Sequence, residues 1–290
     1  MQISRINFQQ VRGFSDSITV TFNFIKQEFK PLITAFAVIV LPWIFVDLFV
    51  KSYVLRDVLN IMAPEPSGNP FANLSATLAS YLSSLIVFYW VFLYVMTYLR
   101  IYSDKFRAQD EARITVGELW HNMIPDIGRM LLWGIVYVLA VILGTICLIV
   151  PGIYLGVAWI FSSYFLIIRK YSVSASMGAS MELIRGQWWN VFGYLIVLQL
   201  IVGGLSYVFS IPYMVLTFKS LFTQQMPGVY EMTFGLLLAN LGQFFLYIIS
   251  LVGVGVRFFG LLEQKEHTTL LSKIEQLGSN EQSMPGEETL

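Results

Sequence analysis

Apolar runs, most of them about as long as a membrane-spanning helix, recur along the chain between polar connections. A helix needs about twenty apolar residues to cross roughly 30 Å of hydrocarbon. Six segments of this kind can be placed, and the pattern therefore predicts an all-α, polytopic membrane protein with six transmembrane helices. The predicted spans are 31–50, 78–99, 131–149, 153–168, 191–212 and 233–256.

The third and fourth spans come from one uncharged stretch. No Lys, Arg, Asp or Glu occurs between Arg129 and Arg169, and this stretch is too long for a single helix. Pro151 and Gly152 stand near its middle, and this dipeptide is typical of a turn. We therefore expect an antiparallel hairpin that turns at Pro151 and Gly152.

Small residues mark the faces on which these two helices are expected to meet. They recur at helical spacing and include a Gly-x-x-x-Gly pattern, which permits close helix approach. These residues are Ala140, Gly144, Gly152 and Gly156. With the turn at Pro151, Gly144 would lie beside Trp159 on the next helix.

Two connections between spans have the pattern of amphipathic helices. Residues 115–129 open with Thr115 and Glu118, which have the spacing of a capping box. Residues 172–185 carry an apolar stripe that ends before Gly186, a typical helix stop. We expect both helices to lie on the cytoplasmic side, where their apolar stripes would bind the membrane surface or a protein partner.

The two ends of the chain differ in character. Within 1–30, large apolar residues from Phe14 onward recur at helical spacing, but part of this segment also alternates like a strand. We favour an interfacial helix, because an exposed strand edge would leave backbone groups unpaired at a membrane surface. Residues 257–290 form a polar tail that we expect to be disordered at its end.

Composition and charge agree with a membrane protein. Hydrophobic residues make up 56% of the chain and charged residues only 12%, too few to cover a soluble globule of this size. Fifteen Lys and Arg residues fall on the side of the two termini and three on the opposite side. The positive-inside rule therefore predicts that both termini lie in the cytoplasm. The net charge of zero gives no sign of nucleic-acid binding.

Asp47 is the one acidic residue within the expected spans, and Lys51 follows it by one helical turn. An acid that precedes a base by four residues forms a favourable helical pair. We favour an ion pair at the outer end of the first span, with its charge reaching outward. The alternative is a site for a transported proton or cation, because intramembrane ionisable residues often serve transport.

The sequence offers little chemistry for catalysis. Its two histidines lie outside the spans, the spans lack paired aspartates, and neither a zinc-protease motif nor a phosphate-binding loop occurs. We therefore expect no catalytic residues, no metal and no cofactor. Polar side chains within the spans either join helices by hydrogen bonds or line a conduit. They are Thr145, Ser162, Ser163, Gln199, Asn240 and Gln243.

One stretch has a recognisable pattern: a Pro-Gly turn, a span with one Trp, a Ser/Ala-rich helix and an exit of the type Leu-x-x-Gly-x-x-Trp. It runs from Pro151 to Asn190 and resembles the membrane domain of bacterial glycerophosphoryl diester phosphodiesterases and related six-span bacterial proteins. In that family the enzymatic chemistry belongs to a separate soluble domain, so we do not carry the activity over. The resemblance implies a bacterial inner-membrane protein that serves an envelope- or lipid-related partner.

Two functional hypotheses remain from the sequence. The first is a non-catalytic membrane scaffold or accessory module that acts through helices 115–129 and 172–185. The second is a small-solute or ion transporter or channel. A transporter requires a polar path through the spans, so the placement of the intramembrane polar residues distinguishes the two.

Overall fold

The computed structural model describes residues 6–61, 70–223 and 228–282, and every regular element within these ranges is helical. A bilayer offers no partners for backbone N–H and C=O groups, and a helix pairs these groups internally. Six segments are long and apolar enough to cross a membrane, which confirms the predicted fold class. They are Phe29–Val54, Leu74–Arg107, Val116–Cys147, Ile149–Ile168, Trp188–Ser220 and Tyr230–Glu266.

The first span is preceded by a helix and contains an irregular turn. Helix α1 (Phe14–Gln27) confirms the helical interpretation of the N-terminal segment. Helix α2 (Phe29–Ala35) then passes through a π-helical turn at Phe36–Val40 into α3 (Leu41–Ile61). Pro42 is the second residue after this turn, and the wider turn accommodates a residue that lacks an N–H and crowds the carbonyl one turn before it.

The capping box predicted after the second span is half formed. Thr115 Oγ1 accepts a hydrogen bond from the Glu118 backbone N–H at 3.2 Å. The Glu118 carboxylate turns away instead and lies 3.2 Å from Lys105 Nζ. The elements of this region are α4 (Pro70–Arg107), α5 (Val116–Met123), a 3-10 turn (Ile124–Asp126) and α6 (Ile127–Cys147).

The fourth span is a broken helix. Helix α7 (Ile149–Ala158) stops before α8 (Ser162–Ile168), and the break leaves backbone groups without helical partners. Ser180 fills this gap, because its hydroxyl donates to the Ala158 carbonyl at 2.8 Å and accepts from the Phe161 N–H at 3.2 Å. The break is therefore closed by another helix of the same chain.

The last three helices are α9 (Val173–Ile184), α10 (Trp188–Thr223) and α11 (Val229–Gln282). Helix α9 ends before Gly186, whose φ of 81° confirms it as the predicted stop. Helix α10 passes through Pro212, where we expected the fifth span to end. Helix α11 continues without a break into the expected tail, and the tail's predicted disordered end, beyond residue 282, lies outside the described residues.

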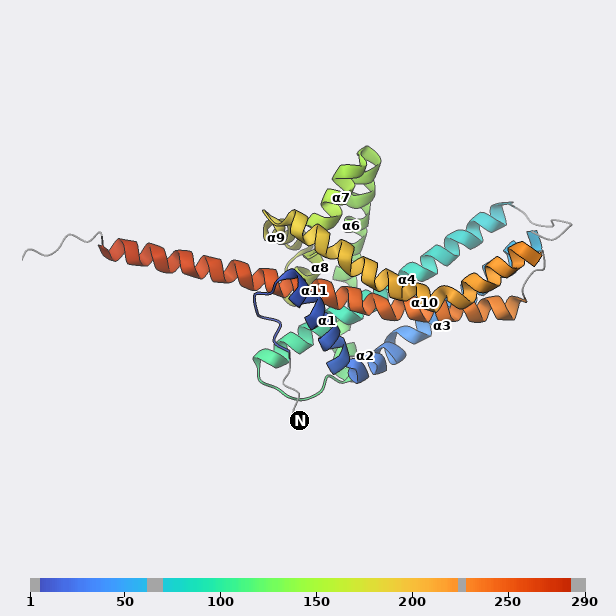
Figure 1. Ribbon diagram of the computed structural model, residues 1–290, viewed down its shortest axis with the longest axis horizontal. Coiled ribbons are helices and arrows are strands. Elements are labelled where there is room, and N and C mark those ends of the chain that lie inside the picture. Colours follow the sequence, from blue (N-terminus) through green and yellow to red (C-terminus); the bar gives the residue numbers. More distant parts are fainter. Residues whose placement is uncertain (1–5, 62–69, 224–227, 283–290) are drawn as a thin grey trace, which may run out of the picture.

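Four helices form a bundle, and a hairpin stands across it. In Figure 1, α3, α4, α10 and α11 extend side by side towards one end of the molecule, whereas α6 and α7 point steeply away from them. Helix α11 contacts α10, α4, α3 and α1, while α6 contacts mainly α7. The core therefore lies around α11, which occupies the centre of the bundle.

Buried tyrosines hold this core together. Each hydroxyl donates to a main-chain carbonyl on a neighbouring helix: Tyr94 to Leu32 at 3.0 Å and Tyr164 to Leu251 at 2.6 Å. Tyr194 similarly donates to the Gly253 carbonyl at 2.8 Å. A buried tyrosine requires such a partner for its hydroxyl, and its ring adds a large apolar surface. These bonds therefore fix the positions of α4, α8 and α10 against α2 and α11.

The α6–α7 hairpin has a different register from the one that we expected. Its turn is at Leu148, which is extended, and Pro151 lies in the first turn of α7, where a missing N–H costs nothing. A Cβ placed on Gly144 would lie 3.2 Å from the Gly152 Cα, so these two glycines meet across the hairpin. The predicted pairing of Gly144 with Trp159 is therefore wrong.

Gly156 and Ala140 do not define the close contact of the hairpin. A Cβ on Gly156 would have the Tyr137 hydroxyl as its nearest neighbour, at an ordinary contact distance of 3.8 Å. That hydroxyl donates to the Gly156 carbonyl at 2.9 Å. Ala140 remains partly exposed. The close approach thus lies near the tip of the hairpin, at Gly144 and Gly152.

The amphipathic helices pack on their own chain. Leu119 and Met123 of α5 are buried, as are Met177 and Ile184 of α9. Helix α5 contacts α4, and α9 contacts α8. The stripes expected to bind a membrane surface or a partner are therefore largely covered by the protein itself.

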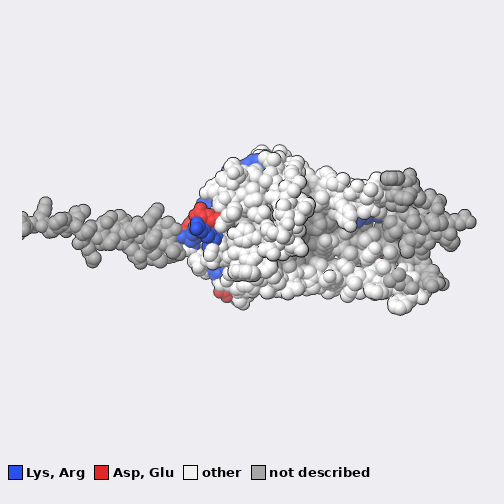
Figure 2. Space-filling model, turned by 90° about the horizontal axis from the view of Figure 1, so that it is seen from above, with Lys and Arg blue, Asp and Glu red and all other residues white. Residues whose placement is uncertain are grey.

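Charged side chains gather at one end of the bundle. Figure 2 shows Lys, Arg, Asp and Glu beside the point where α11 leaves the bundle, whereas most of the remaining visible surface carries none. We call this the basic end, and it includes the C-terminal end of α4, helix α9 and the start of α10. The apolar surface between this end and the opposite one fits the hydrocarbon of a bilayer.

Candidate functional site

The ion pair predicted in the first span is present, but its acid lies inside the bundle. Lys51 Nζ is 2.8 Å from a carboxylate oxygen of Asp47. Asp47 is completely buried, whereas the Lys51 side chain is 22% exposed. The expected ion pair is therefore present, but its acid does not reach outward, because neighbouring helices enclose the carboxylate.

Two further helices complete the surroundings of this pair. From α4, the hydroxyls of Ser83 and Ser84 donate to Asp47 Oδ1 at 2.6 and 3.0 Å. From α11, Asn240 Oδ1 accepts from Lys51 Nζ at 3.2 Å. A buried charge is tolerated where an opposite charge and hydrogen bonds compensate its lost hydration. The cluster formed by Asp47, Lys51, Ser83, Ser84 and Asn240 thus joins α3, α4 and α11.

One turn further along α11, Gln243 lines a groove of about 420 Å³ between α4, α10 and α11. One part of its lining is apolar and comes from Phe88, Val202 and Gly203. The rest carries amides and hydroxyls, which are unusual on a helix surface that faces hydrocarbon. These polar residues are Gln199, Ser206, Tyr207, Ser210, Gln243 and Tyr247.

The groove brings together two of the polar residues that the sequence had suggested. Gln199 of α10 and Gln243 of α11 are both exposed, and both line it. Gln199 Oε1 accepts a hydrogen bond from the Ser250 hydroxyl at 2.9 Å. The Gln199 amide N–H groups remain available for a ligand or water, since a side-chain amide carries two donors beside its oxygen.

The remaining polar residues that the sequence suggested within the spans are Thr145, Ser162 and Ser163. Two of them make hydrogen bonds within the protein. Thr145 Oγ1 donates to the Val141 carbonyl of its own helix at 2.8 Å. Ser162 Oγ accepts from the Trp133 indole N–H at 2.7 Å, which joins α8 to α6. Ser163 Oγ is buried without a hydrogen-bond partner among the described residues. None of these three residues lines the groove.

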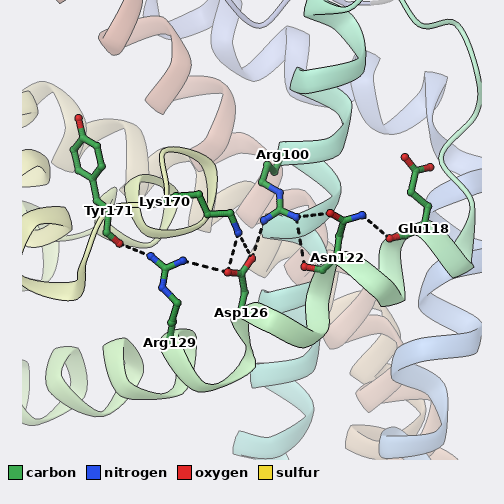
Figure 3. A network of polar contacts seen from close by, with 7 residues as sticks. All are labelled: Arg100, Glu118, Asn122, Asp126, Arg129, Lys170 and Tyr171. Atoms are coloured by element: carbon green, nitrogen blue, oxygen red, sulfur yellow. Dashed lines mark hydrogen bonds and ion pairs between the residues drawn. The ribbon is translucent and has the colours of Figure 1, made fainter.

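A second polar cluster, which the sequence analysis missed, lies at the basic end (Figure 3). Asp126 is 1% exposed and stands between α5 and α6. Arg100 Nη1 of α4 lies 2.8 Å from its Oδ2, and Lys170 Nζ lies 2.6 Å from the same oxygen. Arg129 of α6 contacts Oδ1 at 3.4 Å. We call these four residues the Asp126 network.

Two members of the Asp126 network, Arg100 and Arg129, make further contacts. Arg100 Nη2 donates to Asn122 Oδ1 at 2.8 Å, and Arg129 Nη2 donates to the Tyr171 carbonyl at 2.7 Å. Burial lowers the pKa of the Lys170 ammonium, its hydrogen bond to Asp126 opposes this effect, and the charge of Arg100 adds to it. One carboxylate therefore holds three cations in place.

The sequence contains no distinctive indication of this network. Asp126 follows Pro125 within the helix predicted over 115–129, where a single acidic residue carries no special meaning. Its partners come from three other places in the chain, and only the packing of α4, α6 and the α8–α9 connection brings them together. A pattern along one segment cannot reveal a contact of this kind.

The described residues hold no group of three or more His, Cys, Asp or Glu side chains that could bind a metal ion. The single cysteine, Cys147, is exposed at the end of α6. The Asp47–Lys51 cluster and the groove are polar features of the protein besides the Asp126 network. Comparison of the chain with protein-family models, with curated proteins and with solved structures gave no match.

Proposed function

We propose that this protein is a non-catalytic membrane module that binds an amphipathic molecule of the lipid class from within the bilayer. The groove between α4, α10 and α11 is the observation that carries the proposal. Its volume of about 420 Å³ falls within the range of small-molecule sites in proteins.

The two parts of the groove lining match the two parts of an amphipathic ligand. Phe88, Val202 and Gly203 present an apolar surface to a hydrocarbon chain. Gln199 and Gln243 present amides that hydrogen-bond a polar headgroup or backbone. Gln199 lies roughly three turns into α10, so the ligand would be reached from inside the bilayer rather than from water.

The proposal includes the placement of the protein in a bacterial inner membrane, with both termini in the cytoplasm. The excess of Lys and Arg at one end of the bundle supports this orientation. The resemblance of residues 151–190 to a phosphodiesterase membrane domain stays a prediction, and it agrees with a lipid-related role.

A protein partner at helices α5 and α9 is a weaker basis for function. The apolar stripes of both helices are buried, which leaves residues such as Trp120 and Met181 exposed. Exposed aromatic residues of this kind also anchor a protein in the headgroup layer. We therefore base the proposed function on the groove.

Two adjacent glycines allow a matched test. A Cβ on Gly203 or on Gly204 would meet no atom within 4 Å, so both positions tolerate a larger side chain. Only Gly203 lines the groove. Gly203→Leu should fill the groove and reduce the amount of co-purified lipid, measured by native mass spectrometry, by roughly tenfold, the effect of about 1.4 kcal/mol.

Gly204→Leu is the control and should retain the lipid of the wild-type protein. Both variants should keep their thermal stability, because leucine is a better helix former than glycine. Equal lipid content in the two variants would contradict the proposed function.

Transport of a small solute or ion is the second candidate, and the complete burial of Asp47 favours it. A buried acid beside a base provides a site that binds and releases a proton or cation. In proteoliposomes, a proton or potassium flux that Asp47→Asn abolishes would support transport. A flux no greater than that of empty liposomes would exclude these two ions.

A further inference from the structure

The Asp126 network carries more positive charge than its acid can neutralise. Arg100, Arg129 and Lys170 surround one carboxylate, which leaves a net charge of about +2. Two other carboxylates of the basic end belong to different pairs: Glu118 lies 3.2 Å from Lys105 Nζ, and Glu266 lies 2.9 Å from Arg169. The excess charge therefore has no acidic partner within the recorded ion pairs of the described residues.

The number of hydrogen-bond donors in the network also indicates that a further acceptor can bind. A lysine ammonium has three donors and an arginine guanidinium five. Lys170 uses its ammonium for the two oxygens of Asp126, at 2.6 and 2.9 Å. Arg129 uses two donors, one to Asp126 and one to the Tyr171 carbonyl. Both cations thus keep donors for a further acceptor.

The same two side chains are the accessible part of the network. The Lys170 side chain is 46% exposed and that of Arg129 is 37% exposed, whereas the Arg100 side chain is only 9% exposed. Figure 3 shows that Lys170 and Arg129 reach Asp126 from two different elements, and Asp126 itself is buried. The outward side of the pair is left open to an anion.

The backbone places Lys170 at the end of α8. Its φ of 58° is the left-handed conformation with which helices commonly end, and it follows the C-cap residue Arg169. Lys170 lies two residues beyond Ile168, where the fourth span ends, so the headgroup layer of a bilayer would lie near it.

We infer that Lys170 and Arg129 bind the phosphate group of an anionic ligand at the basic end of the bundle. Arginine and lysine are the usual phosphate ligands, and a site in which both are pre-positioned loses little entropy on binding. The phosphate belongs to an anionic lipid headgroup or to a soluble phosphate. This site is separate from the groove, so it does not depend on the function proposed above.

The test uses the purified full-length protein in detergent, titrated with phosphatidylglycerol or with phosphatidylcholine. Bound lipid is counted by native mass spectrometry. Lys170→Gln and Arg129→Gln should each weaken the binding of phosphatidylglycerol by roughly tenfold, the usual effect of one charge-assisted hydrogen bond. Arg169→Gln is the matched control, because it removes the same charge next to Lys170 from a side chain that pairs with Glu266.

Three additions make the result decisive. Lys170→Arg keeps the charge and should bind like the wild-type protein, which separates a lost ligand contact from a folding defect. Gly203→Leu fills the groove and should leave the difference between the two lipids unchanged. Inorganic phosphate, added as a competitor, distinguishes the sources: displacement of phosphatidylglycerol at sub-millimolar phosphate assigns the site to a soluble phosphate.

Equal binding of phosphatidylglycerol by the wild-type protein, Lys170→Gln and Arg129→Gln would overturn the inference. So would a loss in Arg169→Gln as large as in the other two variants, because the effect would then follow net charge alone. A Lys170→Arg variant that folds but does not bind phosphatidylglycerol would also count against it.

Discussion

The spans that contain α11 and α6 have similar mean hydropathy in their most apolar stretches but opposite surroundings. In the most apolar stretch of the span in α11, 83% of the residues are buried within the protein, against 11% in the span that contains α6. Hydropathy therefore identifies both as spans but does not tell which one faces protein. Inside a bilayer, lipid is as good a solvent for leucine as another helix is.

The difference between the two helices lies in their small and polar residues. In α11, a Cβ on Gly255 would lie 2.7 Å from Leu99, and one on Gly253 would lie 2.8 Å from Leu198. In α6, a Cβ on Gly128 or Gly134 would meet nothing within 4 Å. Glycine thus indicates a protein-facing helix only where another helix approaches it closely. The groove depends instead on the polar residues of α10 and α11.

The largest expected effect is in the bundle core. Gly255→Leu should lower the free energy of unfolding by about 3 kcal/mol, because Leu99 and the hydrogen-bonded Tyr164 leave no space for the side chain. Gly134→Leu on α6 is the matched control and should change stability by less than about 0.5 kcal/mol. Unfolding in mixed detergent measures both, and similar values for the two would contradict the contrast between bundle and hairpin.

The buried acid should have the next largest effect. Asp47→Asn leaves the ammonium of Lys51 without its counter-charge and should cost about 2 kcal/mol. The cost should stay below the range typical of buried pairs, because the Lys51 side chain is 22% exposed and its charge is therefore only partly removed from solvent. An exposed pair would cost at most about 1 kcal/mol, so a loss that small would mean that water reaches Asp47.

The hairpin should respond to overpacking at its tip. A Cβ on Gly152 would lie 2.7 Å from the Thr145 backbone nitrogen, so Gly152→Leu forces α6 and α7 apart. We expect a loss of about 1–2 kcal/mol in stability, smaller than in the core because the hairpin meets lipid on most sides. Thermal unfolding in detergent would show it, and an unchanged midpoint would refute the register with Gly144 opposite Gly152.

Gly156→Leu should have the smallest effect, below about 1 kcal/mol. Its Cβ would have only the Tyr137 hydroxyl nearby, at 3.8 Å. The register expected from the sequence would instead make Gly156 a close-packing position with a larger cost. Measuring Gly152→Leu and Gly156→Leu together therefore decides between the two registers of the hairpin.

The sequence predicted those features that depend on one segment at a time. The six spans follow from runs of apolar residues, and the caps of α5 and α9 follow from Thr115 and Gly186. The turn of the hairpin was misplaced, because Pro151 is equally acceptable in a turn and in the first turn of a helix. The choice depends on how α6 and α7 pack.

The features that join distant segments could not be predicted in the same way. Gln199 and Gln243 were identified as candidate conduit residues, but only the crossing of α10 and α11 places them in one groove. Asp126 gave no distinctive signal, since its cations come from α4, α6 and the connection after α8. The pattern of apolar and polar residues along a helix shows which face is buried, but it does not show which other helix covers that face.

Photo-crosslinking within the spans tests the central claim, lipid binding in the groove, most directly. A benzoylphenylalanine in place of Ser206 would lie in the groove, whereas one in place of Val208, which is 60% exposed on the same helix, would face bulk lipid. We predict that position 206 captures one lipid class in excess of its share of the membrane, while position 208 captures lipids in proportion to their abundance. The same bulk composition at both positions would contradict a binding groove.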